Sequence, residues 1–218
     1  QAANPALAAA TAQSPVTVLA DPASCAVQFD PVGKTQFRSS CDIVKSILAS
    51  AGTPYSNLSG PAGSLATVRV GAAVLVAPDG RALDAASFQA LKTDVSTRLK
   101  GMLHEAGYPA QADPARVNLP GVFLTLMLLV IGATALYGPE AACLVELFPT
   151  RIRYTALSLP YHIGTGWVGG FLPAAAYAMT IASGDIYFGL WYPIIAAVIA
   201  IIVTIVYLPE TRGRAIDG

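Results

Sequence analysis

Glu140 is the residue best placed to carry chemistry, because it is ionisable and lies inside a long apolar stretch. It lies one helical step from Tyr137 and directly follows Pro139. An ionisable group at such a position is costly and by default marks a pathway for ions, protons or substrate. We therefore expect Tyr137 and Glu140 to contribute to a substrate or proton pathway. The alternative is a hydrated Glu140 with a purely structural role.

A second polar set recurs at helical spacing in the next apolar stretch, where Ser158, His162, Thr165 and Gly169 share one helix face. That face is expected to point into a helix bundle, because lipid would leave the imidazole unpaired. Histidine is also the side chain that titrates nearest physiological pH. Two interpretations stay open: Ser158, His162 and Thr165 bind protons or substrate, or His162 forms a structural hydrogen bond to a neighbouring helix.

Charges of opposite sign flank the short connection between these two stretches. Glu146 ends the first stretch, Arg151 and Arg153 open the second, and Pro149 bends the chain between them. Guanidinium groups pair well with carboxylates across a short turn. We expect a charge cluster at this connection.

The three cysteines are divided between two different environments. Cys25 and Cys41 lie in a charged region and Cys143 in an apolar run. In an oxidising compartment the first two could form one disulfide; otherwise they are two small buried thiols. Their spacing does not fit a zinc site, and we expect neither metal nor cofactor.

The elements that must position these residues divide the chain in two. Of its 218 residues 54% are hydrophobic and only 12% are charged, with a mean hydropathy of +0.56, whereas soluble domains carry about 25% charge. Residues 1–118 hold nine of the 13 Lys and Arg and eight of the 13 Asp and Glu. The formal net charge is zero, which argues against nucleic acid as a partner.

Three apolar segments in the second half are long enough to cross a bilayer, which needs about 20 residues in a helix. They cover residues 119–148, 154–182 and 187–208, joined by a loop at 149–153 and a turn at 183–186 and followed by a tail at 209–218. Arg151, Arg153, Arg212 and Arg214 fall on one side of three antiparallel spans. The positive-inside rule makes that side cytoplasmic and places residues 1–118 outside.

The first 118 residues predict a small α+β module with its linker. We expect strands at 16–19, 25–29 and within 65–77, helices at 41–51 and 84–106, and a loop at 53–63. The chain begins with Gln1 and shows neither an initiator Met nor a signal peptide. We interpret it as a fragment that lacks an amino-terminal part.

Enzyme chemistry is not expected, because the nucleophile-elbow, P-loop and dinucleotide fingerprints are missing from the sequence. His104 is most simply a solvated residue near a helix end.

Two motifs carry a resemblance to a known family. YGPEAACLVELFPTRIRYTALSL is similar to the junction of the tenth and eleventh helices in the metabolite:proton symporters of the major facilitator superfamily, and LPETRG resembles the signature after their last helix. The resemblance covers about residues 119–214 in the order expected of helices ten to twelve. Residues 1–118 would then be an enlarged extracytoplasmic loop between helices nine and ten.

The resemblance implies a twelve-helix transporter in the bacterial inner (plasma) membrane. It would move a small organic acid, amino acid or betaine-like metabolite together with protons, and its partners would be lipid and the missing amino-terminal helices. Glu146, Arg151 and Arg153 would help to hold one conformation. The chain departs from many relatives at Glu140 and at Pro160-Tyr161-His162, where those relatives carry amides. The alternative function is a membrane-anchored extracytoplasmic binding or sensor module.

Overall fold

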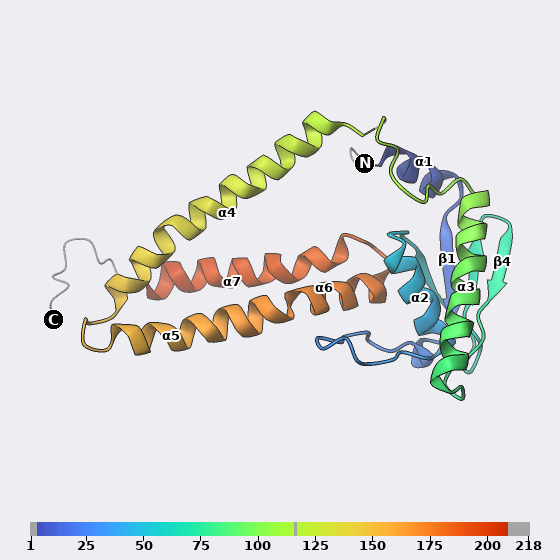
Figure 1. The fold of residues 1–218 in the computed structure, drawn as a ribbon, viewed down its shortest axis with the longest axis horizontal. Coiled ribbons are helices and arrows are strands. Elements are labelled where there is room, and N and C mark those ends of the chain that lie inside the picture. The colour runs from blue at the N-terminus through green and yellow to red at the C-terminus, as the bar shows by residue number, and fades with distance from the viewer. Residues whose placement is uncertain (1–3, 116, 209–218) are drawn as a thin grey trace. The chain divides into compact units, whose positions relative to one another are not determined.

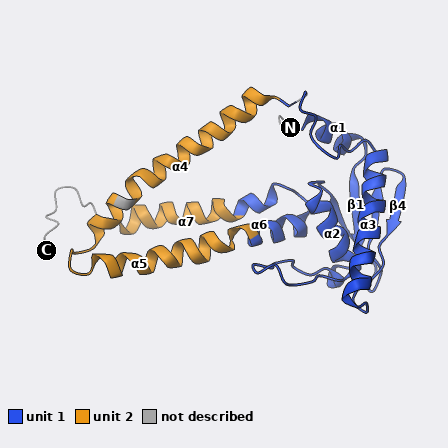
Figure 2. Cartoon of the chain, viewed as in Figure 1, with its two compact units in different colours: residues 1–117, 174–191 blue, residues 118–173, 192–218 orange. Residues whose placement is uncertain are grey.

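The computed structural model describes residues 4–115 and 117–208, and these divide into two compact units. Unit 1 comprises residues 1–117 and 174–191, and unit 2 comprises residues 118–173 and 192–218 (Figure 2). One boundary between the units falls between residues 117 and 118. However, residues 174–191, which we assigned to the second and third spans, group with the amino-terminal module.

A four-stranded sheet forms the centre of unit 1 (Figure 1). Its strands are β1 (Val16–Ala20), β2 (Ser56–Ser59), β3 (Thr67–Val70) and β4 (Ala73–Val76), in the order β2-β1-β3-β4. β1 pairs with β2 in parallel and with β3 antiparallel, and β3 and β4 form an antiparallel hairpin. Val18, Val68 and Leu75 lie opposite one another across this register.

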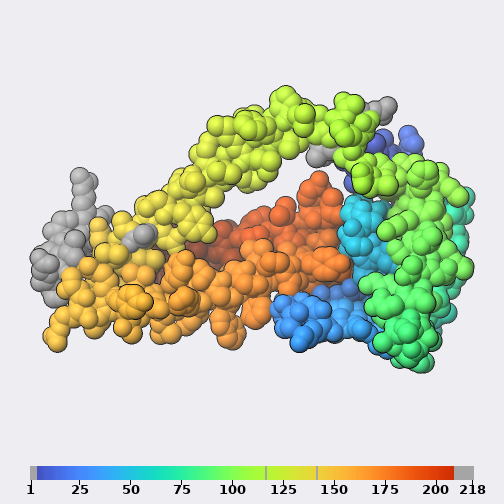
Figure 3. All heavy atoms as spheres, viewed as in Figure 1, coloured from blue at the N-terminus to red at the C-terminus, as the bar shows by residue number. Residues whose placement is uncertain are grey.

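One face of the sheet carries the core. Val16, Val18, Val68 and Val70 are buried, and alternate residues of β1 and β3 are more exposed, as the two-residue period of a strand requires. Helices α2 (Ser40–Ser50) and α3 (Ala85–Glu105) supply the other half of this core. The atoms of α3, drawn in green, form much of the near surface of unit 1 in Figure 3.

The structure contains α3 very nearly where its pattern places it. Asp84 caps its first turn by accepting a hydrogen bond from the Ala86 amide, and Gly107 follows its end with a φ of +84°. Five apolar residues recur along α3 at helical spacing: Leu91 is partly buried, and Phe88, Val95, Leu99 and Leu103 are buried.

The strand that we expected at residues 25–29 is wrong. A short 3-10 turn, η1 (Pro22–Ser24), precedes this segment. Polar groups of residues 25–29 form hydrogen bonds with α2 in place of a neighbouring strand. Asp42 accepts from the Ala26 amide at 2.8 Å, and its own carbonyl accepts from the Gln28 side chain at 2.9 Å. Cys25 also forms a disulfide with Cys41, with 5.3 Å between the Cα atoms.

The loop that we expected at residues 53–63 instead contains β2. Its four residues Ser-Asn-Leu-Ser are all exposed, so the segment has no apolar alternation that would have indicated a strand. The segment is a strand because it pairs with β1 along an edge of the sheet. At the opposite edge, Gly71 opens the two-residue β3–β4 turn with a φ of +56°.

Two further segments complete unit 1. Helix α1 (Pro5–Gln13) precedes β1 and is capped by Asn4. Residues 174–191 contain most of α6 (Gly170–Ser183), a turn at Gly184, and the 3-10 turn η3 (Phe188–Leu190). Ala178 and Ile181 are buried on one side of α6, and Tyr55 and Asn57 of the module contact the backbone at its end.

Unit 2 is helical. It contains α4 (Leu119–Leu147), α5 (Arg153–Ile163), a π-helical segment η2 (Gly164–Gly169), the start of α6, and nearly all of α7 (Trp191–Tyr207). Within the part of the chain that is described, two helical stretches are long and apolar enough to cross a membrane: Leu119–Leu147 and Phe188–Tyr207. The expected middle span is helical throughout 153–183, but η2 divides it into two shorter α-helices.

Candidate functional site

The loop between α4 and α5 brings the first predicted site residue into place. Phe148 ends α4 in an extended conformation, and the Ile152 amide donates to the Pro149 carbonyl at 3.2 Å, which closes the turn. Arg153 opens α5, and its Nε donates to the Phe148 carbonyl at 3.1 Å. The side chain therefore folds back over the turn.

The remaining nitrogen atoms of the Arg153 guanidinium are not all hydrogen-bonded to described residues. Its Nη2 atom is buried and has no hydrogen-bond partner among the residues that the structure describes. A buried donor without a partner costs about 1–3 kcal/mol, more for a charged group. An acceptor that reaches this atom, from solute, water or another helix, would remove that cost.

A groove of about 570 Å³ lies beside Arg153. Val145 and Thr150 form one side, and the remaining lining residues come from α5: Arg153, Tyr154, Leu157, Ser158, Tyr161 and His162. The spacing of these α5 residues places them on one helix face. The groove thus combines a cation, an imidazole, several hydroxyls and an apolar floor.

The structure brings together three of the predicted site residues and leaves the others apart from them. Ser158, His162 and Arg153 line this groove, whereas Tyr137, Glu140 and Thr165 do not. Tyr137 is exposed on α4 and Glu140 is partly buried there. The Thr165 hydroxyl donates to the Tyr161 carbonyl at 2.7 Å, which turns it toward its own helix.

Glu146, Arg151 and Arg153, the residues of the expected charge cluster, all lie at the junction of α4 and α5. Glu146 lies exposed in the last turn of α4 and Arg151 lies exposed in the loop, while Arg153 faces the groove. Its role in holding one conformation remains a prediction.

Two tyrosines are among the groove residues that were not predicted from the sequence. Tyr154 and Tyr161 line the groove with Ser158 and His162, and all four share one face of α5. The signal was available, because positions 154, 158, 161 and 162 follow the i, i+4, i+7, i+8 pattern. A tyrosine on such a face can equally pack as an apolar ring, so its type alone does not mark it as part of a site.

The π-helical segment η2 continues directly from the groove. Such segments are rare and often mark functional sites, because they leave carbonyl groups without their usual partners. Here the Tyr192 hydroxyl of α7 donates to the Val168 carbonyl at 3.1 Å. A Cβ added at Gly164, Gly166 or Gly169 would meet nothing within 4 Å, so this helix surface is open for close packing.

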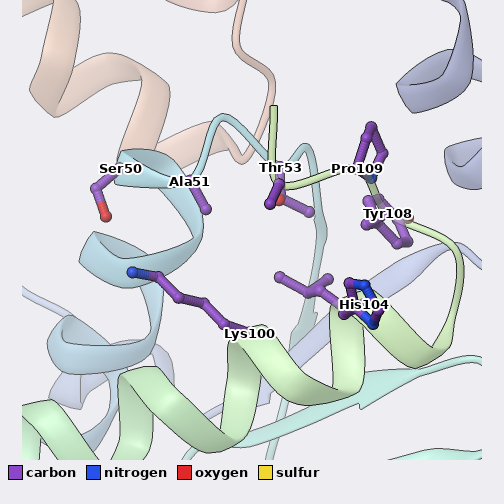
Figure 4. A pocket seen from close by; sticks show the side chains of 9 residues that line it. Ser50, Ala51, Thr53, Lys100, His104, Tyr108 and Pro109 are labelled. Atoms are coloured by element: carbon purple, nitrogen blue, oxygen red, sulfur yellow. The ribbon is translucent and has the colours of Figure 1, made fainter. Parts of the chain in front are cut away.

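Unit 1 contains a separate pocket of about 320 Å³ between the end of α2 and the end of α3. Figure 4 shows Lys100 and His104 rising from α3, with Ser50 and Ala51 on the end of α2. Leu103, Tyr108 and Pro109 contribute apolar surface. The lining contains two basic side chains and no carboxylate, which suits an anionic group.

The carboxyl-terminal half of the chain is similar to known transporters. The sequence profile of the family described as "Sugar (and other) transporter" matches residues 102–218, more than half of the chain. The glycine betaine/proline/ectoine/pipecolic acid transporter OusA of Dickeya dadantii is 32% identical over 97 residues, which are 44% of this chain and 19% of the relative. The proline/betaine transporter of Escherichia coli is 31% identical over 97 residues, with the same shares.

A third relative extends the match slightly. A putative metabolite transport protein of Haemophilus influenzae is 30% identical over 110 residues, 50% of this chain and 25% of the relative. The matched region therefore spans about a fifth to a quarter of these curated relatives. No solved structure matches the chain.

Proposed function

The chain belongs to the family of sugar and other transporters within the major facilitator superfamily, and from this premise we propose that it is the carboxy-terminal part of a secondary active transporter. The expectation that it is not an enzyme is confirmed by its transporter relatives. The proposed solute is a small metabolite such as an organic acid, an amino acid or a betaine, moved together with protons across the bacterial inner membrane.

The observation that carries this proposal is the match over residues 102–218, which includes every residue of the α4–α5 groove. Arg153 offers a positive charge to a carboxylate, and His162 and Ser158 offer groups that exchange protons and donate hydrogen bonds. Proline and betaine, the solutes named for the relatives, both carry a carboxylate. The groove chemistry supports a solute of this class.

The arrangement in the membrane forms part of the same proposal. Residues 154–182 form the middle of three spans, which crosses the bilayer as α5, η2 and α6 in succession. Arg151 and Arg153 face the cytoplasm, and residues 1–118 lie outside. The disulfide between Cys25 and Cys41 suits an oxidising compartment. Glu140 and Tyr137 on α4 then face a pathway completed by helices encoded upstream.

The test is uptake by the full-length protein in proteoliposomes. Radiolabelled proline, glycine betaine and a panel of organic acids are offered with and without an inward proton gradient. We expect uptake that the gradient accelerates and that His162→Gln lowers about a hundredfold or more, within the range that one proton-transfer group contributes. His104→Gln, which changes the other histidine of the chain, serves as the matched control and should leave uptake unchanged. A panel that yields no uptake in either condition contradicts the proposal.

A second function rests on the pocket between α2 and α3. Lys100 and His104 give it two basic side chains, so unit 1 could bind an anionic solute or partner as a sensor module. Calorimetry of the full-length protein with acetate, succinate and phosphate would detect this binding. His104→Gln together with Lys100→Ala should abolish it, while His162→Gln should not.

A further inference from the structure

The end of α6 in unit 1 has an unusual set of partners. The last four carbonyl groups of an α-helix have no partner within the helix, and water usually takes them. In α6 these belong to residues 180–183. The Gly184 amide donates to the Thr180 carbonyl at 2.8 Å, as an ordinary helix end provides.

The other three carbonyls are taken by two side chains of the amino-terminal module. The Tyr55 hydroxyl donates to Ile181 at 2.5 Å. The Asn57 side-chain amide has two hydrogens, and its nitrogen lies 3.0 Å from the Ala182 carbonyl and 2.9 Å from that of Ser183. Two side chains more than 120 residues away in sequence thus complete the cap of α6.

The backbone closes the same contact from the other side. The Tyr55 amide donates to the Gly184 carbonyl at 3.0 Å. Gly184 has a φ of +82°, and a Cβ added to it would lie 2.1 Å from the Tyr55 carbonyl oxygen. The two chain segments approach so closely that only glycine fits at this position.

The contact between Tyr55 and the end of α6 is also buried. Tyr55 is 7% exposed, and Ala178 and Ile181 are the buried residues of α6. Burial raises the pKa of the Tyr55 hydroxyl, so the group remains a hydrogen-bond donor throughout the physiological range. On the following side of the turn, a Cβ at Gly189 would lie 2.5 Å from the Ala176 carbonyl oxygen, so η3 also packs tightly onto α6.

We propose that Tyr55 and Asn57 form an interaction surface for the turn between α6 and α7. Through this contact, which we call the splint, the amino-terminal module holds the turn rigidly, so that module and turn move as one body during transport. The proposal rests on the transport function for its consequence, but the contact itself does not. It assigns the amino-terminal module a mechanical role in place of a passive position in a long loop.

The first test measures the contact without any transport. Hydrogen exchange of the full-length protein in nanodiscs is followed in peptides covering residues 53–59 and 181–190. Tyr55→Phe combined with Asn57→Ala should accelerate exchange in both peptides about a hundredfold, the effect expected when three hydrogen bonds worth about 1 kcal/mol each are lost. Tyr108→Phe is the matched control, because the Tyr108 hydroxyl also donates to a backbone carbonyl, that of Ser14, at 2.7 Å but within the module itself. Unchanged exchange in the double variant would overturn the proposal that Tyr55 and Asn57 hold the turn.

The second test asks whether module and turn ever separate. Asn57→Cys and Ser183→Cys are introduced together in a Cys143→Ser background, so that Cys143 cannot compete for the new bond. The proposal expects the cross-link to form and uptake to be retained, because the joined parts already move together. A cross-linked protein that loses uptake, and regains it when the new bond is reduced, would show that they separate and would refute the proposal.

Two comparisons keep these outcomes distinct. The single variant Asn57→Cys, treated with the same oxidant and reductant, reports any effect of reducing the native disulfide. If the unmodified protein takes up no solute, the transport proposal fails while the exchange result still decides whether the contact exists.

Discussion

Gly184 and Tyr55 approach each other so closely that the Gly184 carbonyl accepts the Tyr55 amide at 3.0 Å and a Cβ on Gly184 would lie 2.1 Å from the Tyr55 carbonyl oxygen. A positive φ alone requires glycine at several positions of this chain. At Gly184 the neighbouring backbone adds a second requirement, because backbone cannot rotate away as a side chain can.

This relationship predicts a difference between two glycine substitutions. Gly63 also has a positive φ, +75°, but a Cβ added there would meet nothing within 4 Å. Gly63→Ala should therefore cost only the left-handed strain, about 1–2 kcal/mol. Gly184→Ala should cost clearly more, because residue 55 must also move. Thermal unfolding of the two purified variants measures the difference, and equal midpoints would contradict the close approach.

A second prediction concerns the guanidinium of Arg153. Its Nε donates a hydrogen bond to the Phe148 carbonyl, and its Nη2 is buried without an acceptor among the described residues. We therefore expect the planar geometry of the guanidinium, as well as its charge, to contribute to uptake. Arg153→Lys should reduce the maximal uptake rate about tenfold, whereas Arg151→Lys, at an exposed loop position, should change it little. Both variants keep the positive charge on the proposed cytoplasmic side. Equal effects would indicate that only charge matters.

A third prediction concerns the disulfide between Cys25 and Cys41. It closes a loop with a sequence separation of 16, for which the chain-entropy estimate is about 3 kcal/mol. Replacing both cysteines by serine should lower the stability of the module by about that amount. Limited proteolysis within residues 20–60 of the full-length protein should accelerate accordingly, while cleavage in the α4–α5 loop serves as the internal reference and stays constant.

The core of unit 1 supplies a fourth prediction. Leu99 on α3 is fully buried, so Leu99→Ala should cost about 2–5 kcal/mol through lost burial and a residual cavity. Val74 on the opposite side of the sheet is 53% exposed, and Val74→Ala should stay within about 0.5 kcal/mol. Denaturant-induced exchange of the β1 amides distinguishes the two. A small effect at Leu99 would mean that α3 does not pack on the sheet.

A fifth prediction follows from Asp21. Backbone hydrogen bonds, first from the Gly63 amide and then from that of Ala23, lower the pKa of this carboxyl below its ordinary value of 3.8. Because the folded pKa is depressed, the carboxylate stabilises the fold fully above pH 3.8, and this stability is lost as the pH falls through the lower folded pKa.

The corresponding measurement is pepsin cleavage near residue 63 as a function of acid pH. The unmodified protein should become susceptible as the pH drops below about 3.8, whereas Asp21→Asn should be susceptible already at higher pH and show less pH dependence. Asp94→Asn removes a carboxylate from an exposed pair with Arg98 and should leave the profile unchanged.

Periodicity, segment length and one sequence motif by themselves determined much of this protein. The apolar stripe of 84–106 anticipated α3 almost to its ends, because a helix that buries one face must repeat its apolar residues with a helical period. The length of the run after residue 118 anticipated a helix able to span a membrane. The motif around 137–159 anticipated the transporter family.

The pairing of distant segments was decided only by the tertiary structure. Residues 56–59 are a strand because β1 lies beside them, although their own composition is that of a loop. Residues 25–29 are not a strand, because Asp42 takes up their polar groups. The fold around the α4–α5 loop places Arg153 and His162 in the lining of the groove, whereas Glu140 on α4 does not line it.

The cap of α6 shows the reason most clearly. The sequence alone indicated a tight turn at Ser183-Gly184-Asp185, because the connection between the two apolar segments is too short for anything longer. It could not indicate that Tyr55 and Asn57 donate to the carbonyls before that turn. Periodic patterns record which face of one element is buried, whereas a hydrogen bond between segments over 120 residues apart depends on where the folded chain brings them together.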